Sequence, residues 1–181
     1  SFYGCSNLTS IKIPENVELI GFKTFFECTN LITVILPSKL TKIDTEVFYE
    51  CTNLTSINLP KNLSVIDYSA FYRCLSLTSI DIPGNVTYIG HDAFYSCSKL
   101  STIIIPKSVT YIGKNAFYKC TNLSSVKYLG IQNPNNISFV FNNTLVNIVN
   151  VTRKYKDDTF CGIPVFFHIT SSFTQSQIFT L

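Results

Sequence analysis

A 23-residue repeat constrains this chain more than any other feature of its sequence. A cysteine recurs every 23 residues in six copies, and phenylalanine, leucine, isoleucine and proline keep fixed distances from it. The cysteines are Cys5, Cys28, Cys51, Cys74, Cys97 and Cys120, and the prolines are Pro14, Pro37, Pro60, Pro83 and Pro106. A period of this length around the pattern L-x-x-I-x-I predicts a solenoid in which each turn covers the apolar face of its neighbour.

Each repeat contains two extended segments and a short return arc. In the first segment Ile11 and Ile13 alternate with polar residues, which predicts a short strand with its isoleucines inward. The proline that follows has no N–H and is expected to end that strand. A V-x-x-I segment then predicts a second strand on another side of the coil, followed by a glycine expected to adopt positive φ at Gly21, Gly90 and Gly113. The arc between phenylalanine and cysteine is too short for a full α-helix, and we expect a 3₁₀ turn or a single turn there.

The stretch FYSCSKLSTIIIPKSVTYIG, from Phe94 to Gly113, resembles the BspA-like class of leucine-rich repeats. The resemblance extends from Phe2 to about Tyr128. It implies a right-handed, mostly β solenoid with short 3₁₀ or helical return arcs and an irregular C-terminal cap. Members of this class occur in surface proteins of bacteria and protists and are often linked to adhesion, so the resemblance implies a binding protein and names no ligand.

The period divides the chain into three parts. Residues 1–128 hold five full repeats and a partial sixth, residues 129–165 are interpreted as a degenerate repeat that caps the solenoid, and residues 166–181 are a strand or a tail. In the degenerate repeat, Phe139 or Phe141 is expected near the phenylalanine column and Leu145 near the leucine column. Residues 148–151 are predicted to form the first strand of this repeat. No comparable cap precedes Ser1, so we expect further repeats before it in a longer chain.

The cysteine column has three interpretations. Adjacent turns of a solenoid lie about 4.8 Å apart, which is within the range of a disulfide, but stacked side chains point in parallel rather than toward each other. A metal requires converging ligands, and the chain has no Cys-x-x-Cys motif with a neighbouring histidine. We therefore favour a column of small buried side chains, each with a weak donor, and expect no cofactor.

No set of residues indicates catalysis. The chain has two histidines, His91 and His168, and neither forms a recognisable triad with a serine or cysteine. Asp157 and Asp158 are more readily explained as a solvated loop than as an acid–base pair. We expect a protein that is not an enzyme, with a catalytic site in the cap as a minor alternative.

The outward positions of the first strand are the predicted binding face. One column is almost uniformly serine and threonine, which is also explained as strand-compatible filler. The adjacent column varies and includes apolar residues that solubility alone does not favour; it consists of Lys12, Ile35, Asn58, Asp81, Ile104 and Lys127. On the second segment, Tyr88 and Tyr111 are one turn apart and are expected to form an aromatic ridge.

Composition excludes several classes of protein. Apolar residues make up 46% and charged residues 14%, with a net charge of +3, so disorder and nucleic-acid binding are not indicated, and no apolar run is long enough to span a membrane. Asn85, Asn136, Asn142 and Asn150 lie in glycosylation sequons. We expect a cell-surface or secreted adhesion module for a protein or glycan; a cytoplasmic scaffold or cytoskeleton-associated protein, suited to reduced cysteines, is the alternative.

Overall fold

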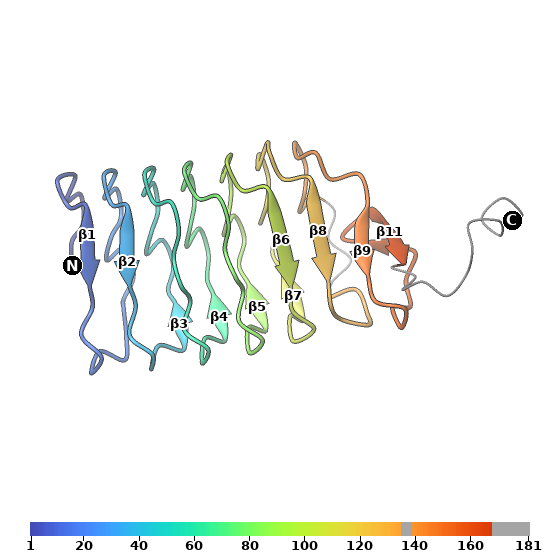
Figure 1. Ribbon diagram of the computed structural model, residues 1–181, viewed down its shortest axis with the longest axis horizontal. Coiled ribbons are helices and arrows are strands. Elements are labelled where there is room, and N and C mark those ends of the chain that lie inside the picture. Colours follow the sequence, from blue (N-terminus) through green and yellow to red (C-terminus); the bar gives the residue numbers. More distant parts are fainter. Residues whose placement is uncertain (135–138, 168–181) are drawn as a thin grey trace, which may run out of the picture.

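The chain coils into a β-solenoid of about six turns that ends in a cap (Figure 1). A computed structural model describes residues 1–134 and 139–167; Asn136, His168 and the tail from residue 168 onward lie outside them. Within the described residues there is no helix, and therefore none long and apolar enough to cross a membrane. The predicted solenoid is confirmed.

Parallel strands form the first face of the solenoid. They are β1 (Ser10–Lys12), β2 (Thr33–Ile35), β6 (Thr102–Ile105), β8 (Ser125–Tyr128) and β9 (Val149–Val151). Ile11 pairs with Val34 and Ile103 with Val126, so like positions lie on like. β6 ends directly before Pro106, as expected of a residue that cannot donate to the sheet.

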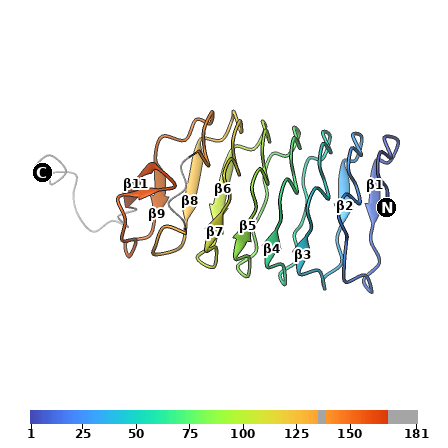
Figure 2. The same cartoon turned by 180° about the vertical axis from the view of Figure 1, so that it is seen from behind.

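The two middle turns depart from this pattern. Residues 56–59 and 79–82 are not hydrogen-bonded as strands, although Ile57 and Ile80 each expose only 5% of their surface and continue the core. A second hydrogen-bonded sheet, on the second segment, runs through these turns and through one turn on either side. It consists of β3 (Lys42–Ile43), β4 (Val65–Ile66), β5 (Tyr88–Ile89) and β7 (Tyr111–Ile112), which are parallel and line up along one side of the molecule (Figure 2).

The return arcs are chains of separate turns rather than 3₁₀ helices. Two residues in each arc have a left-handed backbone, for example Glu46 with φ of 55° and Glu50 with φ of 54°. A left-handed residue at every fourth position interrupts the run of i to i+3 hydrogen bonds that a 3₁₀ helix needs. The arcs bond to each other instead: Glu46, Phe48 and Glu50 donate their N–H groups to carbonyls of the next arc at 2.7–2.9 Å.

The prediction of positive φ at Gly21, Gly90 and Gly113 is wrong. The left-handed positions fall on non-glycine residues of the arcs and on Gly4 and Gly162. Gly90 and Gly113 are needed for close approach, because a Cβ on Gly113 would lie 2.3 Å from the backbone nitrogen of His91 in the preceding turn. A Cβ on Gly21 would meet nothing within 4 Å.

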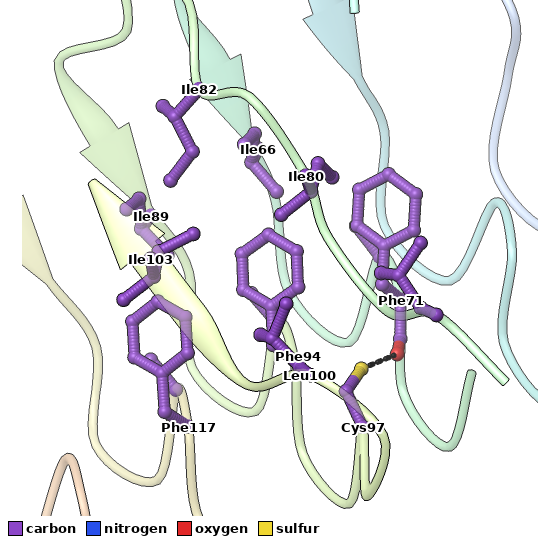
Figure 3. Close-up of a cluster of buried hydrophobic side chains, with 14 of the residues drawn as sticks. Ile66, Phe71, Ile80, Ile82, Ile89, Phe94, Cys97, Leu100, Ile103 and Phe117 are labelled. Atoms are coloured by element: carbon purple, nitrogen blue, oxygen red, sulfur yellow. Dashed lines mark hydrogen bonds between the residues drawn. The ribbon is translucent and has the colours of Figure 1, made fainter. Parts of the chain in front are cut away.

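Identical side chains stack through the core (Figure 3). The phenylalanine rings lie face to face at 5.2–5.5 Å, and Phe71 and Phe94 differ by only 4° in ring plane. Leucine, cysteine and isoleucine columns surround them, and from the second turn onward these residues are buried. Each turn thus hides its apolar face against its neighbours, which is what stabilises a repeat that is too small to fold alone.

The cap continues the first sheet and then ends it. β11 (Ile163–Phe167) adds to β9 in parallel, and the two-residue β10 (Thr159–Phe160) pairs with β11 in antiparallel orientation at the edge. Phe141, not Phe139, extends the phenylalanine column and stacks on Phe117 at 5.3 Å.

Two details of the degenerate repeat differ from the sequence pattern. Val146 fills the leucine column, whereas Leu145 is 62% exposed, because Val146 keeps the 23-residue distance from Leu123. β11 runs to Phe167, two residues past the predicted end of the cap at residue 165.

Candidate binding surfaces

The variable column of the first strands lies on one face and is exposed along its whole length. Strand register places Lys12 beside Ile35 and Ile104 beside Lys127. Asn58 and Asp81 are also exposed, in the two turns without strand hydrogen bonds. Ile35 and Ile104 expose 56% and 53% of their surface. The structure therefore brings all six residues of this column, which we call the strand face, onto one side of the solenoid.

Hydroxyl groups on neighbouring columns bond to the preceding turn. Thr78 Oγ1 donates to the Thr55 carbonyl at 3.4 Å, and on the second segment Thr110 Oγ1 donates to the Thr87 carbonyl at 3.2 Å. Ser64 does the same to Thr41 at 3.0 Å. Serine and threonine hydroxyls of these columns thus form hydrogen bonds between turns. A column rich in hydroxyl groups therefore does not by itself indicate a ligand site.

The sequence analysis missed an aromatic ladder on the arcs. It comprises Tyr3, Phe26, Tyr49, Tyr72, Tyr95 and Tyr118, stacked at 4.5–5.1 Å. The signal available in the sequence was the aromatic pair before each of the six repeat cysteines, which is Phe-Tyr in five copies and Phe-Phe before Cys28. Because the rings face each other, they present mainly their edges to solvent, and the ladder is first a contact between turns.

A second aromatic group lies beside the second sheet. Tyr88 and Tyr111 stack at 4.8 Å, and Tyr68 meets the ring of His91 edge-on at 5.3 Å. The Tyr111 hydroxyl lies 2.8 Å from His91 Nε2, so this histidine is held by a neighbouring tyrosine. Desolvation, with a smaller contribution from Tyr68, raises the pKa of the Tyr88 hydroxyl. The predicted role of Tyr88 and Tyr111 in binding stays a prediction.

The cysteine column is made of unpaired thiols, and all seven cysteines of the chain are free. From Cys28 to Cys120, each Sγ donates to the carbonyl oxygen of the phenylalanine 26 residues earlier, at 3.0–3.2 Å. Figure 3 shows this bond between Cys97 and Phe71. Burial raises the pKa of the Cys74 and Cys97 thiols well above the ordinary value, which keeps them protonated and unreactive.

The cap contains a polar groove of about 650 Å³, lined by Gln132, Asn133, Lys156, Asp157, Asp158 and Thr159. Asp157 Oδ2 accepts the backbone N–H of Asn133 at 2.8 Å. No group of three or more potential metal ligands occurs among residues 1–134 and 139–167. This groove is lined by residues of the two loops that follow β8 and β9.

The sequon asparagines have different surroundings. Asn85 is exposed and its side-chain amide donates to the Lys61 carbonyl at 2.9 Å, and Asn142 is also exposed. Asn150 lies in β9 and is half-buried. Asn136 lies outside the described residues. Glycosylation stays a prediction for all four.

The chain is similar to known repeat proteins over most of its length. A family profile described as "BspA type Leucine rich repeat region (6 copies)" matches residues 1–124 and 41–163. The leucine-rich repeat protein TpLRR of T. pallidum is 28% identical, with a TM-score of 0.66 over 83% of this chain and 79% of that one. A leucine-rich repeat protein from Eubacterium ventriosum is 33% identical, with a TM-score of 0.59 over 65% of this chain and 32% of that one.

A third structure supports the fold alone. A leucine-rich repeat protein from Bacteroides ovatus is 20% identical, with a TM-score of 0.65 over 90% of this chain and 61% of that one. No curated protein matches the chain.

Proposed function

Because the chain belongs to the BspA-type leucine-rich repeat family, we propose that it is a non-catalytic binding module of a cell-surface or secreted protein. Its role is adhesion to, or recognition of, a protein or glycan through the strand face. Leucine-rich repeat solenoids generally serve as scaffolds for protein binding, and their repetition creates an extended surface that can meet a large ligand.

The observation that carries this proposal is the exposure of Ile35 and Ile104, in the second and fifth turns of an otherwise polar strand face. Both point outward from hydrogen-bonded strands, and neither completes the core. Exposed aliphatic side chains framed by polar residues are typical of sites that contact another protein. Lys12, Asn58, Asp81 and Lys127 supply the varied polar surroundings in which such contacts gain specificity.

The test is adhesion of beads coated with the purified chain to epithelial cells, together with binding to arrays of matrix proteins and glycans. Ile35→Asp combined with Ile104→Asp is expected to reduce adhesion at least about tenfold, as for loss of central apolar contacts. The matched control is Leu19→Asp with Leu145→Asp, which changes two exposed leucines away from the strand face. Unchanged adhesion by the isoleucine variant, with native circular dichroism, refutes the assignment of the strand face.

A further inference from the structure

Charge is segregated along the chain. Residues 93–156 contain eight lysines and arginines and no aspartate or glutamate, whereas residues 1–92 contain six basic and nine acidic residues. The small net charge of the whole chain conceals this difference. The later turns of the solenoid therefore carry a strongly positive surface that the earlier turns do not share.

Ion pairing separates the same two regions. Among the described residues, five ion pairs join residues between Glu18 and Arg73, as where Lys42 Nζ lies 3.0 Å from Asp44 and 2.7 Å from Asp67. Among the residues that the structure describes, no lysine from Lys99 onward is in an ion pair. In the early turns acidic partners pair with four of the six basic side chains, whereas in the described later turns the lysines lack such partners.

Five of the eight basic residues gather at one edge. They lie at the ends of the last strands or on the loops that follow, at the lower edge of the molecule in Figure 1. Thr152 Oγ1 donates to the Gly130 carbonyl at 3.2 Å and the Lys156 N–H donates to the Ile131 carbonyl at 3.1 Å, which joins two of these loops. We call this exposed set the basic edge: Lys107, Lys127, Arg153, Lys154 and Lys156.

The polar groove of the cap opens at the basic edge and shares Lys156 with it. Gln132, Asn133 and Thr159 offer amide and hydroxyl groups, while Asp157 and Asp158 accept hydrogen bonds. These two carboxylates repel an anionic group placed in the groove itself, but they bind neutral hydroxyls. A ligand that fits both features has negative groups along its length and hydroxyls between them.

These features favour a sulfated sugar polymer over a nucleic acid. Four of the five basic residues are lysines, whereas nucleic-acid and phosphate recognition relies heavily on the planar fork of arginine. Single-stranded nucleic acid also needs exposed aromatic faces for its bases. The tyrosines of these loops, Tyr128 and Tyr155, are buried, and the exposed rings of Phe166 and Phe167 lie on β11 rather than on the loops of the basic edge.

We propose that the basic edge binds a sulfated polysaccharide. Lys107, Lys127 and Lys154 contact sulfate groups on successive sugars, and the groove beside Lys156 holds one sugar through its hydroxyls. This site shares Lys127 with the strand face, but it does not depend on the function proposed for Ile35 and Ile104.

The experiment measures binding of immobilised heparin, as a sulfated probe, to the purified full chain at several salt concentrations. Lys107→Gln with Lys154→Gln is expected to weaken binding at least about tenfold and to make its salt dependence shallower, since fewer counterions are released. The matched control is Lys61→Gln with Lys39→Gln. These two lysines occupy the same positions of earlier turns, 46 and 115 residues before, so the control removes equal charge from the same kind of loop.

Support requires that the control pair changes affinity less than about twofold and that fully desulfated heparin competes poorly. Equal weakening by both pairs overturns the proposal, because net charge alone then explains binding. Tighter binding of single-stranded DNA of equal charge than of heparin also overturns the proposal and identifies the ligand as a nucleic acid. The proposal is likewise overturned if the unaltered chain does not bind heparin. Since neither pair touches Ile35 or Ile104, bead adhesion separates failure here from failure of the strand face.

Discussion

Cys74 Sγ donates a hydrogen bond of 3.2 Å to the carbonyl oxygen of Phe48 in the preceding turn. The same oxygen accepts the backbone N–H of Cys51 at 3.2 Å, so one buried carbonyl receives two donors from successive turns. A thiol is a weak donor, but it is also small and apolar enough for a fully buried position. The cysteine column therefore joins the turns without any covalent bond.

Removing one of these thiols is expected to destabilise the solenoid. Cys74→Ala deletes the donor and leaves a small cavity, which lowers the free energy of unfolding by about 1–2 kcal/mol. Urea denaturation followed by circular dichroism measures the change. Cys5→Ala is the control, because Cys5 is exposed, and a loss at Cys5 equal to that at Cys74 contradicts this account.

The thiols are expected to differ sharply in reactivity. Cys5 is exposed, whereas burial raises the pKa of Cys161 to about 12 and that of Cys74 well above the ordinary value. The thiolate is the reactive form, and at pH 8 a thiol with a pKa near 12 is ionised to only about one part in ten thousand. Brief treatment with iodoacetamide should add one adduct by mass, which Cys5→Ser abolishes. Rapid modification at several sites contradicts the buried column.

Gly113 is expected to tolerate no side chain. Gly113→Ala places a Cβ 2.3 Å from the backbone nitrogen of His91, so the two turns must separate, at an expected cost above about 2 kcal/mol. Gly84→Ala is the matched control, because a Cβ there meets nothing within 4 Å, and its effect should stay within about 0.5 kcal/mol. Thermal and urea denaturation of both variants compare the two sites directly.

Stability is expected to fall at alkaline pH. Burial raises the pKa of the Tyr128 hydroxyl from its ordinary value near 10 to about 12, and this hydroxyl donates to the Gln132 carbonyl at 2.9 Å. The folded state thus holds the proton more tightly than the unfolded state, so this stabilisation is complete below pH 10 and is lost as the pH rises toward 12.

One such group lowers the free energy of unfolding by up to about 1.4 kcal/mol per pH unit over that window. Tyr128→Phe should be less stable at pH 7 but show a shallower decline between pH 10 and 12, measured by urea titrations at fixed pH. Tyr3→Phe, at an exposed position, should leave the slope unchanged. The same slope in Tyr128→Phe and the unaltered chain rules out this role for Tyr128.

The sequence predicts the solenoid well because one constraint is repeated. Columns such as Phe71 and Phe94 must coincide when turns stack, so a period in residues becomes a contact in space. The left-handed arc residues were missed because Glu46 and Glu50 carry no sequence signature of that backbone. Of the glycines predicted to adopt it, Gly90 and Gly113 serve close packing instead. In the cap the period breaks, and only burial shows that Val146, rather than Leu145, continues the core.

The binding surfaces are less predictable for the same reason. The repeat identifies the residues that pack against the neighbouring turn. A ligand instead contacts the exposed positions at which the residue type varies between repeats. Ile35 and Ile104 stand out from their column by residue type, and they are exposed in the structure. The basic edge is visible in the sequence only when charges are counted by region, and its gathering on adjacent loops depends on the hydrogen bonds that join the loops after β8 and β9.

The arrangement of contacts also determines how the molecule responds to mechanical force. Each turn bonds only to its neighbours through the arcs and the two sheets, so tension along the axis loads these interfaces in series and the weakest one opens first. A released turn of 23 residues lengthens the chain by about 80 Å while the remaining turns stay folded. Under force such a solenoid extends turn by turn and dissipates work, and its turns refold when the tension drops. A contact held through this solenoid therefore lengthens in steps under load before it breaks.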